Sequence, residues 1–236
     1  MANQSIQRLC KFASCKFLST FLFTDFNKVL YLGIYETYGT RNYNYMKNSM
    51  EAIKQHFDGL GDQSQSLRTP FDKAVGVFPC RTFNLDKQSA SKPHTDNNNL
   101  ARGWCSVTAL GNFDPIHGGH LVLWDLGLVI QFPPGSTILI PSSIILHSNT
   151  PIKPNEVRYS IVQYAAGHLF RWHNNGCLND KEWKDKATPE MMEKWEKERY
   201  SRWEEAVSSF TTLEELEKTE KRVETILGKK KRKKLP

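Results

Sequence analysis

The stretch "GHLVLWDLGLVIQFPPGSTILIPSSIILHS", residues 119–148, alternates short apolar runs with turn residues. The breaks carry Gly or Pro, as in "DLG" and "PPG". Apolar runs of about four to eight residues between such breaks are typical of β-strands. The pattern continues in both directions, through "WCSVTAL" at 104–110 and "VRYSIVQYAA" at 157–166, and predicts six strands between about residues 104 and 165.

The spacing of these strands indicates the fold class. They recur at intervals of roughly ten residues with no helix between them, and a parallel sheet would need crossover helices. We therefore expect an antiparallel sandwich or barrel. Before it, residues 1–65 are predicted to be mainly helical. "NSMEAIKQHFDGLG" at 48–61 reads as a helix capped by Asn48 and ended by Gly59.

The chain beyond residue 175 is charged and helical in character. Thr188-Pro189 reads as a cap followed by a first-turn proline. Three- and four-residue steps then predict an amphipathic helix packing on the barrel, with a Trp-lined ligand site as the alternative; the residues concerned are Met192, Trp195, Arg199 and Trp203. We thus expect an N-terminal region packing on the core at 1–65, the core at 66–175, C-terminal helices at 176–228 and a basic tail at 229–236.

Composition limits the class of protein. A chain of 236 residues with 39% hydrophobic content can bury one sizeable core. No apolar run approaches the roughly 20 residues that span a bilayer, so we expect no membrane association. The five cysteines are widely spread and none lies in a CxxC, which favours reduced thiols and an intracellular address over a disulfide framework.

The net charge of +7 is concentrated at one end of the chain. "KKKRKK" at 229–234 carries six positive charges, which leaves the body of the protein near neutral. The run is typical of a nuclear-localisation signal or a phosphate-attracting tail, and a solvated, disordered end is the alternative.

Two His-x-Asp sequences compete as a metal site, and such a short motif arises easily by chance. In the predicted helix, His56 and Asp58 are two residues apart and do not share a face, so we expect His56 to pack or cap. On extended chain, residues i and i+2 point the same way, so His94 and Asp96 can reach one metal. Non-haem iron oxygenases hold Fe(II) with two imidazoles and one carboxylate.

Two residues downstream favour the second motif. His147 ends the apolar run "SIILHS" and could supply the third ligand, although a buried histidine with a structural role fits as well. Arg158 lies in a predicted strand with Ser160 and Tyr164 on its face and no acid there. A buried guanidinium needs a carboxylate partner, which points to an external dicarboxylate. A surface arginine on an edge strand is the other interpretation.

These residues and their surroundings resemble a known family. The segments "HTDNNNLARGWCSVTAL", "HLVLWDLG", "PPGSTILIPSSIILHSNTPI" and "RYSIVQY", within about residues 80–170, are similar to the TET/JBP branch of the 2-oxoglutarate/Fe(II) dioxygenases, particularly compact fungal members. The resemblance implies an α+β fold with a double-stranded β-helix (jelly-roll, cupin-like) core between N- and C-terminal helices. It implies Fe(II) and 2-oxoglutarate as cofactors, ascorbate as an aid to turnover, and a monomer that acts in the nucleus on double-stranded DNA carrying methylated bases.

The resemblance also implies residue roles at the cofactors. His94, Asp96 and His147 correspond to the iron ligands. Arg158 and Ser160 correspond to the residues that hold the distal carboxylate of 2-oxoglutarate. Family members contact this cosubstrate with a further histidine and a second arginine, and the candidates here are His120, Arg81 and Arg102.

For the substrate, the resemblance implies that Asn99 contacts the exocyclic amino group of a flipped base and that Tyr164 stacks on it. The family places a histidine eight residues after the arginine, against the pyrimidine ring. This chain has Ala166 there, with His168 as a possible substitute.

The implied reaction oxidises the methyl group of 5-methylcytosine to 5-hydroxymethylcytosine, with further oxidation open. Because of Ala166, N6-methyladenine demethylation or activity on both bases stays an alternative. So do a 2-oxoglutarate oxygenase acting on RNA or protein and a non-catalytic, DNA-binding cupin-like barrel.

Overall fold

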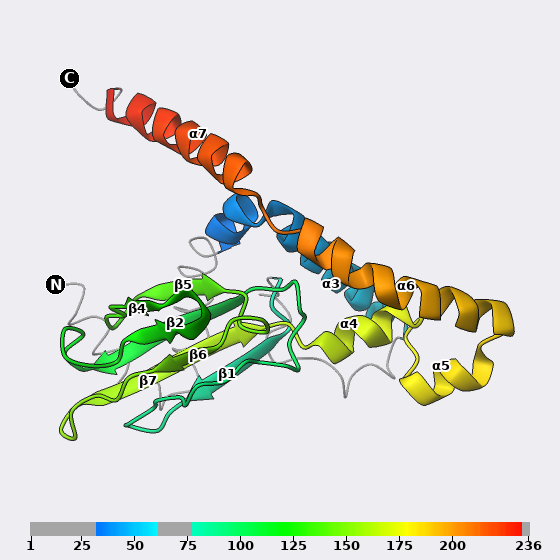
Figure 1. Cartoon of the computed structure of the whole chain (residues 1–236), viewed down its shortest axis with the longest axis horizontal. Coiled ribbons are helices and arrows are strands. Elements are labelled where there is room, and N and C mark those ends of the chain that lie inside the picture. The colour runs from blue at the N-terminus through cyan, green and yellow to red at the C-terminus, as the bar shows by residue number, and fades with distance from the viewer. Residues whose placement is uncertain (1–31, 61–76, 233–236) are drawn as a thin grey trace.

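The computed structural model describes residues 32–60 and 77–232, with side chains as far as residue 225. The helix predicted for residues 1–31 and 61–65 lies outside this range. Residues 32–38 are helical and lead into α3. The elements that follow are α3 (Thr40–Gly59), β1 (Cys80–Asn84), β2 (Cys105–Asn112), β3 (Leu121–Leu123), the 3-10 helix η3 (Trp124–Leu126), β4 (Leu128–Ile130), β5 (Thr137–Ile140), β6 (His147–Asn149), β7 (Val157–Tyr164), α4 (Gly167–Asn174), α5 (Asp180–Lys186), α6 (Pro189–Ser208) and α7 (Leu213–Arg232) (Figure 1).

The strands form two antiparallel sheets, with orders β1-β7-β2-β5 and β4-β3-β6. One apolar cluster lies between them, with Ala109 of β2 and Ile140 of β5 from the larger sheet and Leu123 of β3 from the smaller. Two packed antiparallel sheets with helices at the ends make an α+β jelly-roll, the double-stranded β-helix expected for this chain. The predicted fold class is confirmed.

The strand boundaries differ from the prediction in three places. β1 forms in a segment for which the sequence predicts no strand. "HLVLWDL" is a strand for three residues and then turns into η3. "SIIL" is not a strand, because the N–H groups of Ile144 and Ile145 donate to the Pro141 carbonyl, at 3.0 and 3.2 Å. His147 therefore begins β6 and does not end it.

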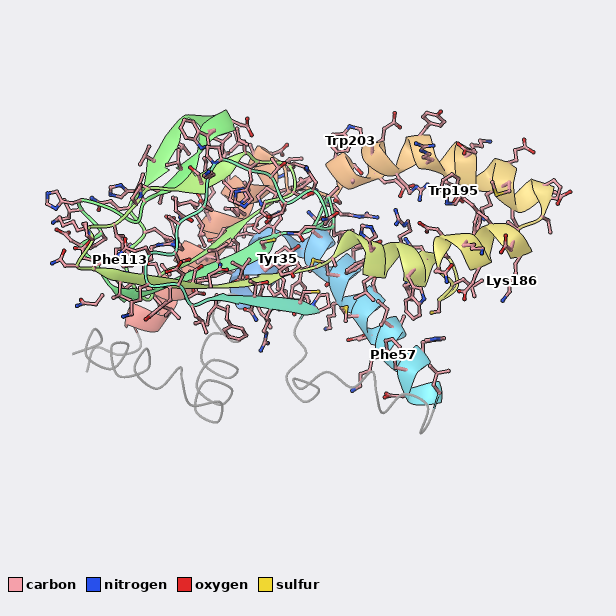
Figure 2. The ribbon with its side chains drawn as sticks, turned by 90° about the horizontal axis from the view of Figure 1, so that it is seen from below. Tyr35, Phe57, Phe113, Lys186, Trp195 and Trp203 are labelled. Atoms are coloured by element: carbon pink, nitrogen blue, oxygen red, sulfur yellow. The ribbon has the colours of Figure 1, made fainter. Side chains whose placement is uncertain are left out.

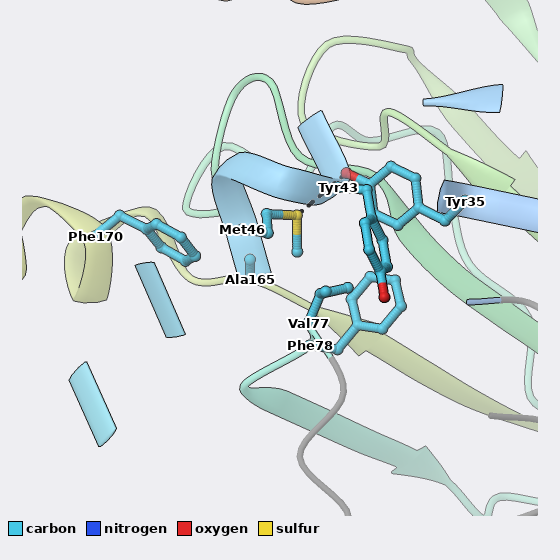
Figure 3. Packing of buried hydrophobic residues seen from close by; sticks show 7 residues of the cluster. All are labelled: Tyr35, Tyr43, Met46, Val77, Phe78, Ala165 and Phe170. Atoms are coloured by element: carbon cyan, nitrogen blue, oxygen red, sulfur yellow. Dashed lines mark hydrogen bonds between the residues drawn. The ribbon is translucent and has the colours of Figure 1, made fainter. Parts of the chain in front are cut away.

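A second cluster joins the helices to one end of the sheets. It combines Tyr35, Tyr43, Met46, Val77, Phe78, Ala165 and Phe170 (Figure 3). The hydroxyl of Tyr35 donates to the sulfur of Met46 at 3.1 Å. Because Tyr43 and Met46 are buried here, α3 starts at Thr40 after Gly39, and the predicted cap at Asn48 is wrong. Gly59 ends the helix as predicted.

The C-terminal helices do not cover the barrel as predicted. Thr188 caps α6 and Pro189 follows it, as expected, but Ala206 is the one buried residue of this helix. Trp203 is 59% exposed, and the Trp195 ring lies 5.9 Å from that of Trp183 in α5 (Figure 2). The apolar stripe of α6 therefore meets α5 and solvent.

The chain then continues into α7, which points away from the sheets (Figure 1). This helix includes the first residues of the predicted basic tail. Within the described residues, no helix is both long and apolar enough to cross a membrane.

Candidate metal centre

Two chain segments bring His94, Asp96 and His147 together. His94 and His147 form an antiparallel bridge in which each backbone N–H donates to the other carbonyl at 3.0 Å. Directly opposed residues project to the same side of a sheet, and the ring centroids are 4.4 Å apart. Asp96 Oδ1 lies 3.6 Å from His94 Nε2. The potential ligand atoms lie within 4.8 Å of one another, and no other such group occurs in the described part of the chain.

Backbone carbonyls determine which ring nitrogen of each histidine is available. His94 Nδ1 is 2.7 Å from the Lys92 carbonyl, and His147 Nδ1 is 2.8 Å from the Ile145 carbonyl. A carbonyl only accepts, so the Nδ1 atoms carry the hydrogens and the Nε2 lone pairs stay free. Metal-ligating histidines usually donate their second nitrogen in this way. Two such imidazoles and a carboxylate fit a 2-His-1-carboxylate iron site.

Two hydrogen bonds fix the backbone and the carboxylate of Asp96. The Asp96 N–H donates to the Ser142 carbonyl at 2.9 Å, and Asn99 Nδ2 donates to Asp96 Oδ2 at 3.2 Å. The same Asn99 nitrogen lies 3.3 Å from Cys105 Sγ. Burial raises the pKa of the Cys105 thiol to about 12, so this group is an uncharged neighbour at neutral pH.

Arg158 points into the barrel from β7. It is paired with Gly111 of β2, two residues from the core residue Ala109, so both lie on the inner face of the sheet. Gly111 has φ 120°, and a Cβ there would lie 2.1 Å from the Val157 carbonyl oxygen, so only glycine fits this close approach.

The Arg158 guanidinium is 1% exposed and only partly satisfied. Its Nη1 donates to the Ser89 carbonyl at 2.7 Å, whereas Nε and Nη2 are buried without a partner. Loss of hydration lowers its pKa to about 10. Two unpartnered N–H groups on one guanidinium match the two oxygens of a carboxylate, and native structures rarely leave such donors unpaired.

Ser160 lies on the same inner face, next to a residue that the sequence did not suggest. Asn84 of β1 is in register with Ser160, and its Nδ2 donates to Ser160 Oγ at 2.9 Å. Because that oxygen accepts from Asn84, the Ser160 hydrogen is available to a further acceptor. Asn84 was missed because "CRTFN" has no apolar alternation that would mark β1 as a strand.

The segment 88–99 connects these two groups. It bridges Gln88 to Arg158, His94 to His147, and Asn99 to Ala166. This segment therefore runs past the buried guanidinium, supplies two potential metal ligands and, after a turn at Asn97 and Asn98, ends beside the start of α4. Tyr164 lies near this end on the inner face, with its hydroxyl 3.5 Å from Thr82 Oγ1.

Three residues implied at the cosubstrate lie elsewhere. His120 directs Nε2 to the Pro115 carbonyl at 2.9 Å, and strand alternation puts it opposite to the face of Leu121 and Leu123. Arg81 is in register with Gln163, on the outer face of the sheet. Arg102 stacks over the Tyr45 ring, 3.7 Å from its centroid. The structure therefore places none of them with Arg158 and Ser160.

Two further histidines named in the sequence analysis also lie outside the cluster. His168 is exposed in the first turn of α4, where Ala166 is the cap residue. The competing His56 packs its ring edge-on against Trp172, with 5.4 Å between centroids. His56 thus packs, as predicted, and lies in a helix away from the cluster.

Comparisons with known proteins give likenesses of fold. Neither protein-family models nor curated proteins match this chain. Among solved structures, NgTET1 in complex with 5mC DNA has 21% identity and a TM-score of 0.36, covering 58% of this chain and 52% of that one. A viral collagen prolyl hydroxylase from Paramecium Bursaria Chlorella virus-1, in its 2OG complex, has 15% identity and a TM-score of 0.27, covering 36% and 60%. A 2OG-Fe(II) oxygenase family oxidoreductase from Burkholderia pseudomallei has 23% identity and a TM-score of 0.27, covering 48% and 57%.

The match thus spans about half of NgTET1 and less than two thirds of the other two. At these values the likeness concerns the arrangement of strands, so the chemistry of the site must follow from the residues of this chain.

Proposed function

We propose that this protein is an Fe(II)- and 2-oxoglutarate-dependent dioxygenase that oxidises the methyl group of 5-methylcytosine in DNA. The observation that carries the proposal is one barrel interior holding both a His94–Asp96–His147 cluster and the buried, half-satisfied guanidinium of Arg158. A metal cluster alone fits many proteins. A cluster that shares the inner side of the jelly-roll with a buried, half-satisfied guanidinium fits an enzyme that uses a metal and a dicarboxylate together.

Separate residues would hold the metal and the cosubstrate. His94, Asp96 and His147 would hold Fe(II), with Nδ1 hydrogen bonds fixing the orientation of both rings. Three ligands leave positions free for other groups. When bound, Fe(II) and 2-oxoglutarate would supply the oxidising chemistry with dioxygen as the oxidant: one oxygen atom goes into the succinate formed from the cosubstrate as CO2 is lost, and the other goes into the methyl group.

Arg158 and Ser160 would bind the distal carboxylate of 2-oxoglutarate. Arg158 offers Nε and Nη2, and Ser160 offers the hydroxyl hydrogen that Asn84 leaves free. A charge-assisted, bidentate contact in a buried site fixes the direction of the ligand as well as its affinity. Since Arg81 and Arg102 lie elsewhere, no second arginine is assigned.

Methylated DNA is the substrate that the sequence resemblance favours. A base stacked in a duplex cannot bring its methyl group to a metal held between His94, Asp96 and His147, so the target nucleotide has to leave the stack. Tyr164 offers an aromatic ring on the inner face, and a base stacked on such a ring gains about 1–3 kcal/mol.

N6-methyladenine is the second candidate. Ala166, at the position of the expected pyrimidine-reading histidine, is the α4 cap and offers only a methyl group. Without that hydrogen bond, the proposed pocket has less to distinguish cytosine from adenine. Oxidation of an N-methyl group gives a hydroxymethylamine that loses formaldehyde, so the outcome there is demethylation. We further propose a nuclear location, supported by the basic run at 229–234.

The test is nucleoside mass spectrometry after incubation with Fe(II), 2-oxoglutarate and duplexes that each carry one methylated base, with methylated RNA in parallel. We expect 5-hydroxymethylcytosine and succinate from the wild type, no product from His94→Ala, and normal product from His117→Ala, which changes an exposed histidine. Equal product from His94→Ala would refute the metal assignment. DNA binding with no Fe(II)-dependent product would instead favour a non-catalytic barrel.

A further inference from the structure

A small polar cluster is buried behind the proposed metal site. Cys105 is 2% and Ser142 is 1% exposed, and their Sγ and Oγ atoms are 2.7 Å apart. The Asn99 amide nitrogen completes the cluster, 3.3 Å from Cys105 Sγ and 3.5 Å from Ser142 Oγ. Three polar side chains gathered at the end of an apolar core need a reason, because desolvating them costs free energy.

Among the residues that the structure describes, the charged group to which this cluster donates a hydrogen bond is the carboxylate of Asp96. Asn99 Nδ2 donates to Asp96 Oδ2 at 3.2 Å, while Asp96 Oδ1 faces His94 Nε2 at 3.6 Å. The two oxygens thus have separate partners, one toward the protein and one toward the histidines. Ser142 fixes the same residue a second time, since its carbonyl accepts from the Asp96 N–H at 2.9 Å.

The backbone keeps Asn99 in this position. Its N–H donates to the Asp96 carbonyl at 2.8 Å, and the next residue, Leu100, donates to the Ala165 carbonyl at 2.8 Å. The four-residue turn Asp96–Asn99 is therefore anchored to the end of β7. The side chain of Asn99 is held inside the turn, whereas Asn98 is exposed.

We infer that Asn99 is a positioning residue for the metal-ligating Asp96, with Cys105 and Ser142 as the support that orients its amide. Asn99 occupies Oδ2 of Asp96, so Oδ1 would be the oxygen that holds the metal, and the direction of this carboxylate is set before a metal binds. This replaces the role of base reader that the resemblance implies for Asn99. The inference rests on the proposed metal site.

The experiment measures metal binding without turnover. Binding of Mn(II) to the metal-free full-length chain is followed by calorimetry in the wild type, Asn99→Ala and Asn98→Ala. Loss of such a supporting hydrogen bond typically weakens metal binding roughly 10- to 100-fold. We expect that weakening for Asn99→Ala and an unchanged affinity for Asn98→Ala, which removes an exposed amide from the same loop.

A second variant separates positioning from folding. Asn99→Leu keeps most of the side-chain volume without a donor, and circular dichroism reports whether each variant is folded. We expect the same loss of Mn(II) affinity in folded Asn99→Leu. Wild-type Mn(II) affinity in either folded Asn99 variant, with weaker preference for a methylated over an unmethylated duplex, would overturn the inference and restore the base-reading role.

The failure of the metal site itself has a different signature. If the wild type and His94→Ala bind Mn(II) equally, the proposed function fails, whatever the Asn99 variants do. If His94→Ala abolishes binding and both Asn99 variants bind like the wild type, the proposed function stands and the positioning role fails.

Discussion

The barrel interior and the α5–α6 hairpin depart from ordinary burial in opposite ways. In the barrel, the charged Arg158 is 1% exposed and has two N–H groups without partners. In the hairpin, the apolar Trp203 is 59% exposed. A buried, unsatisfied charge is costly, whereas a single exposed aromatic ring costs little. Strong selection is therefore needed to keep the first arrangement, which is why the barrel interior points to a ligand and the hairpin does not.

The largest predicted difference between the barrel and the hairpin is in the free energy of unfolding after truncation of one aromatic side chain in each. Phe113 lies in the cluster between the sheets and is 7% exposed, so Phe113→Ala should lower the free energy of unfolding by about 3–5 kcal/mol. Trp203→Ala should change it by no more than about 0.5 kcal/mol, because the ring is mostly in water. Urea denaturation of both variants measures the difference. A cost for Trp203→Ala as large as that for Phe113→Ala would mean that α6 packs against the barrel in solution after all.

The second prediction is that one substitution at Arg158 weakens 2-oxoglutarate binding without lowering the stability of the fold. Arg158→Met removes the proposed receptor for the distal carboxylate, and losing a buried charged partner typically costs about 2–5 kcal/mol of binding, so 2-oxoglutarate affinity should fall on the order of 100-fold. The same change replaces an uncompensated buried charge with an apolar side chain. The metal-free, ligand-free protein should therefore be as stable as the wild type or more stable, by roughly 1 kcal/mol.

Calorimetry with Mn(II) in place of iron gives the 2-oxoglutarate affinity, and urea denaturation gives the stability. Arg81→Met is the matched control, since Arg81 lies on the outer face of the sheet and should not affect 2-oxoglutarate affinity. If Arg158→Met binds 2-oxoglutarate like the wild type, the guanidinium is not the receptor. If it also unfolds more easily, Arg158 has a structural role.

The sequence could predict those features that follow from strand alternation alone. The two-residue spacing of His94 and Asp96 and of Arg158 and Ser160 gave each pair a common face, and the structure has these faces directed inward. The sequence could not show which residues of β1 point inward, because "CRTFN" has no apolar alternation. Arg81 and Asn84 lie on opposite faces only because this segment is a strand. The helical spacing of apolar residues also predicted α6 correctly as a helix. A period identifies a stripe on a helix, but it does not say whether a barrel, another helix or solvent lies against it.

Asn99 shows a related limit. Its distance of three residues from Asp96 is compatible with a side chain that faces the substrate or one that turns back to the carboxylate. The choice is made by Cys105 and Ser142, which are close in space but six and 43 residues away in the chain. No local pattern contains that information.

The smallest predicted effect lies where the helices join. Arg41 of α3 makes two hydrogen bonds to Glu215 of α7, at 2.8 and 3.0 Å, and this lowers the pKa of the Glu215 carboxyl to about 2. Arg41 also donates to the Phe210 carbonyl at 2.7 Å, so the pair fastens the start of α7 to α3. A carboxyl whose pKa is lower in the folded state stabilises that state above its unfolded pKa, and the contribution disappears as the pH falls. The attachment should therefore be complete above about pH 4.5 and lost progressively toward about pH 2.

Hydrogen exchange of the α7 backbone amides can detect this attachment, because it reports local opening that global unfolding hides. Near neutral pH, Glu215→Gln should exchange faster than the wild type in the first turns of α7, and the difference should shrink as the pH falls below about 4.5. Both side chains are exposed, so screening by salt should reduce the effect further. Glu214→Gln is the control, since the ion pair that the structure describes for Glu214 lies within α7, with Lys218 Nζ at 2.7 Å. A difference between Glu215→Gln and the wild type that does not change with pH would show that Glu215 acts through packing and not through its charge.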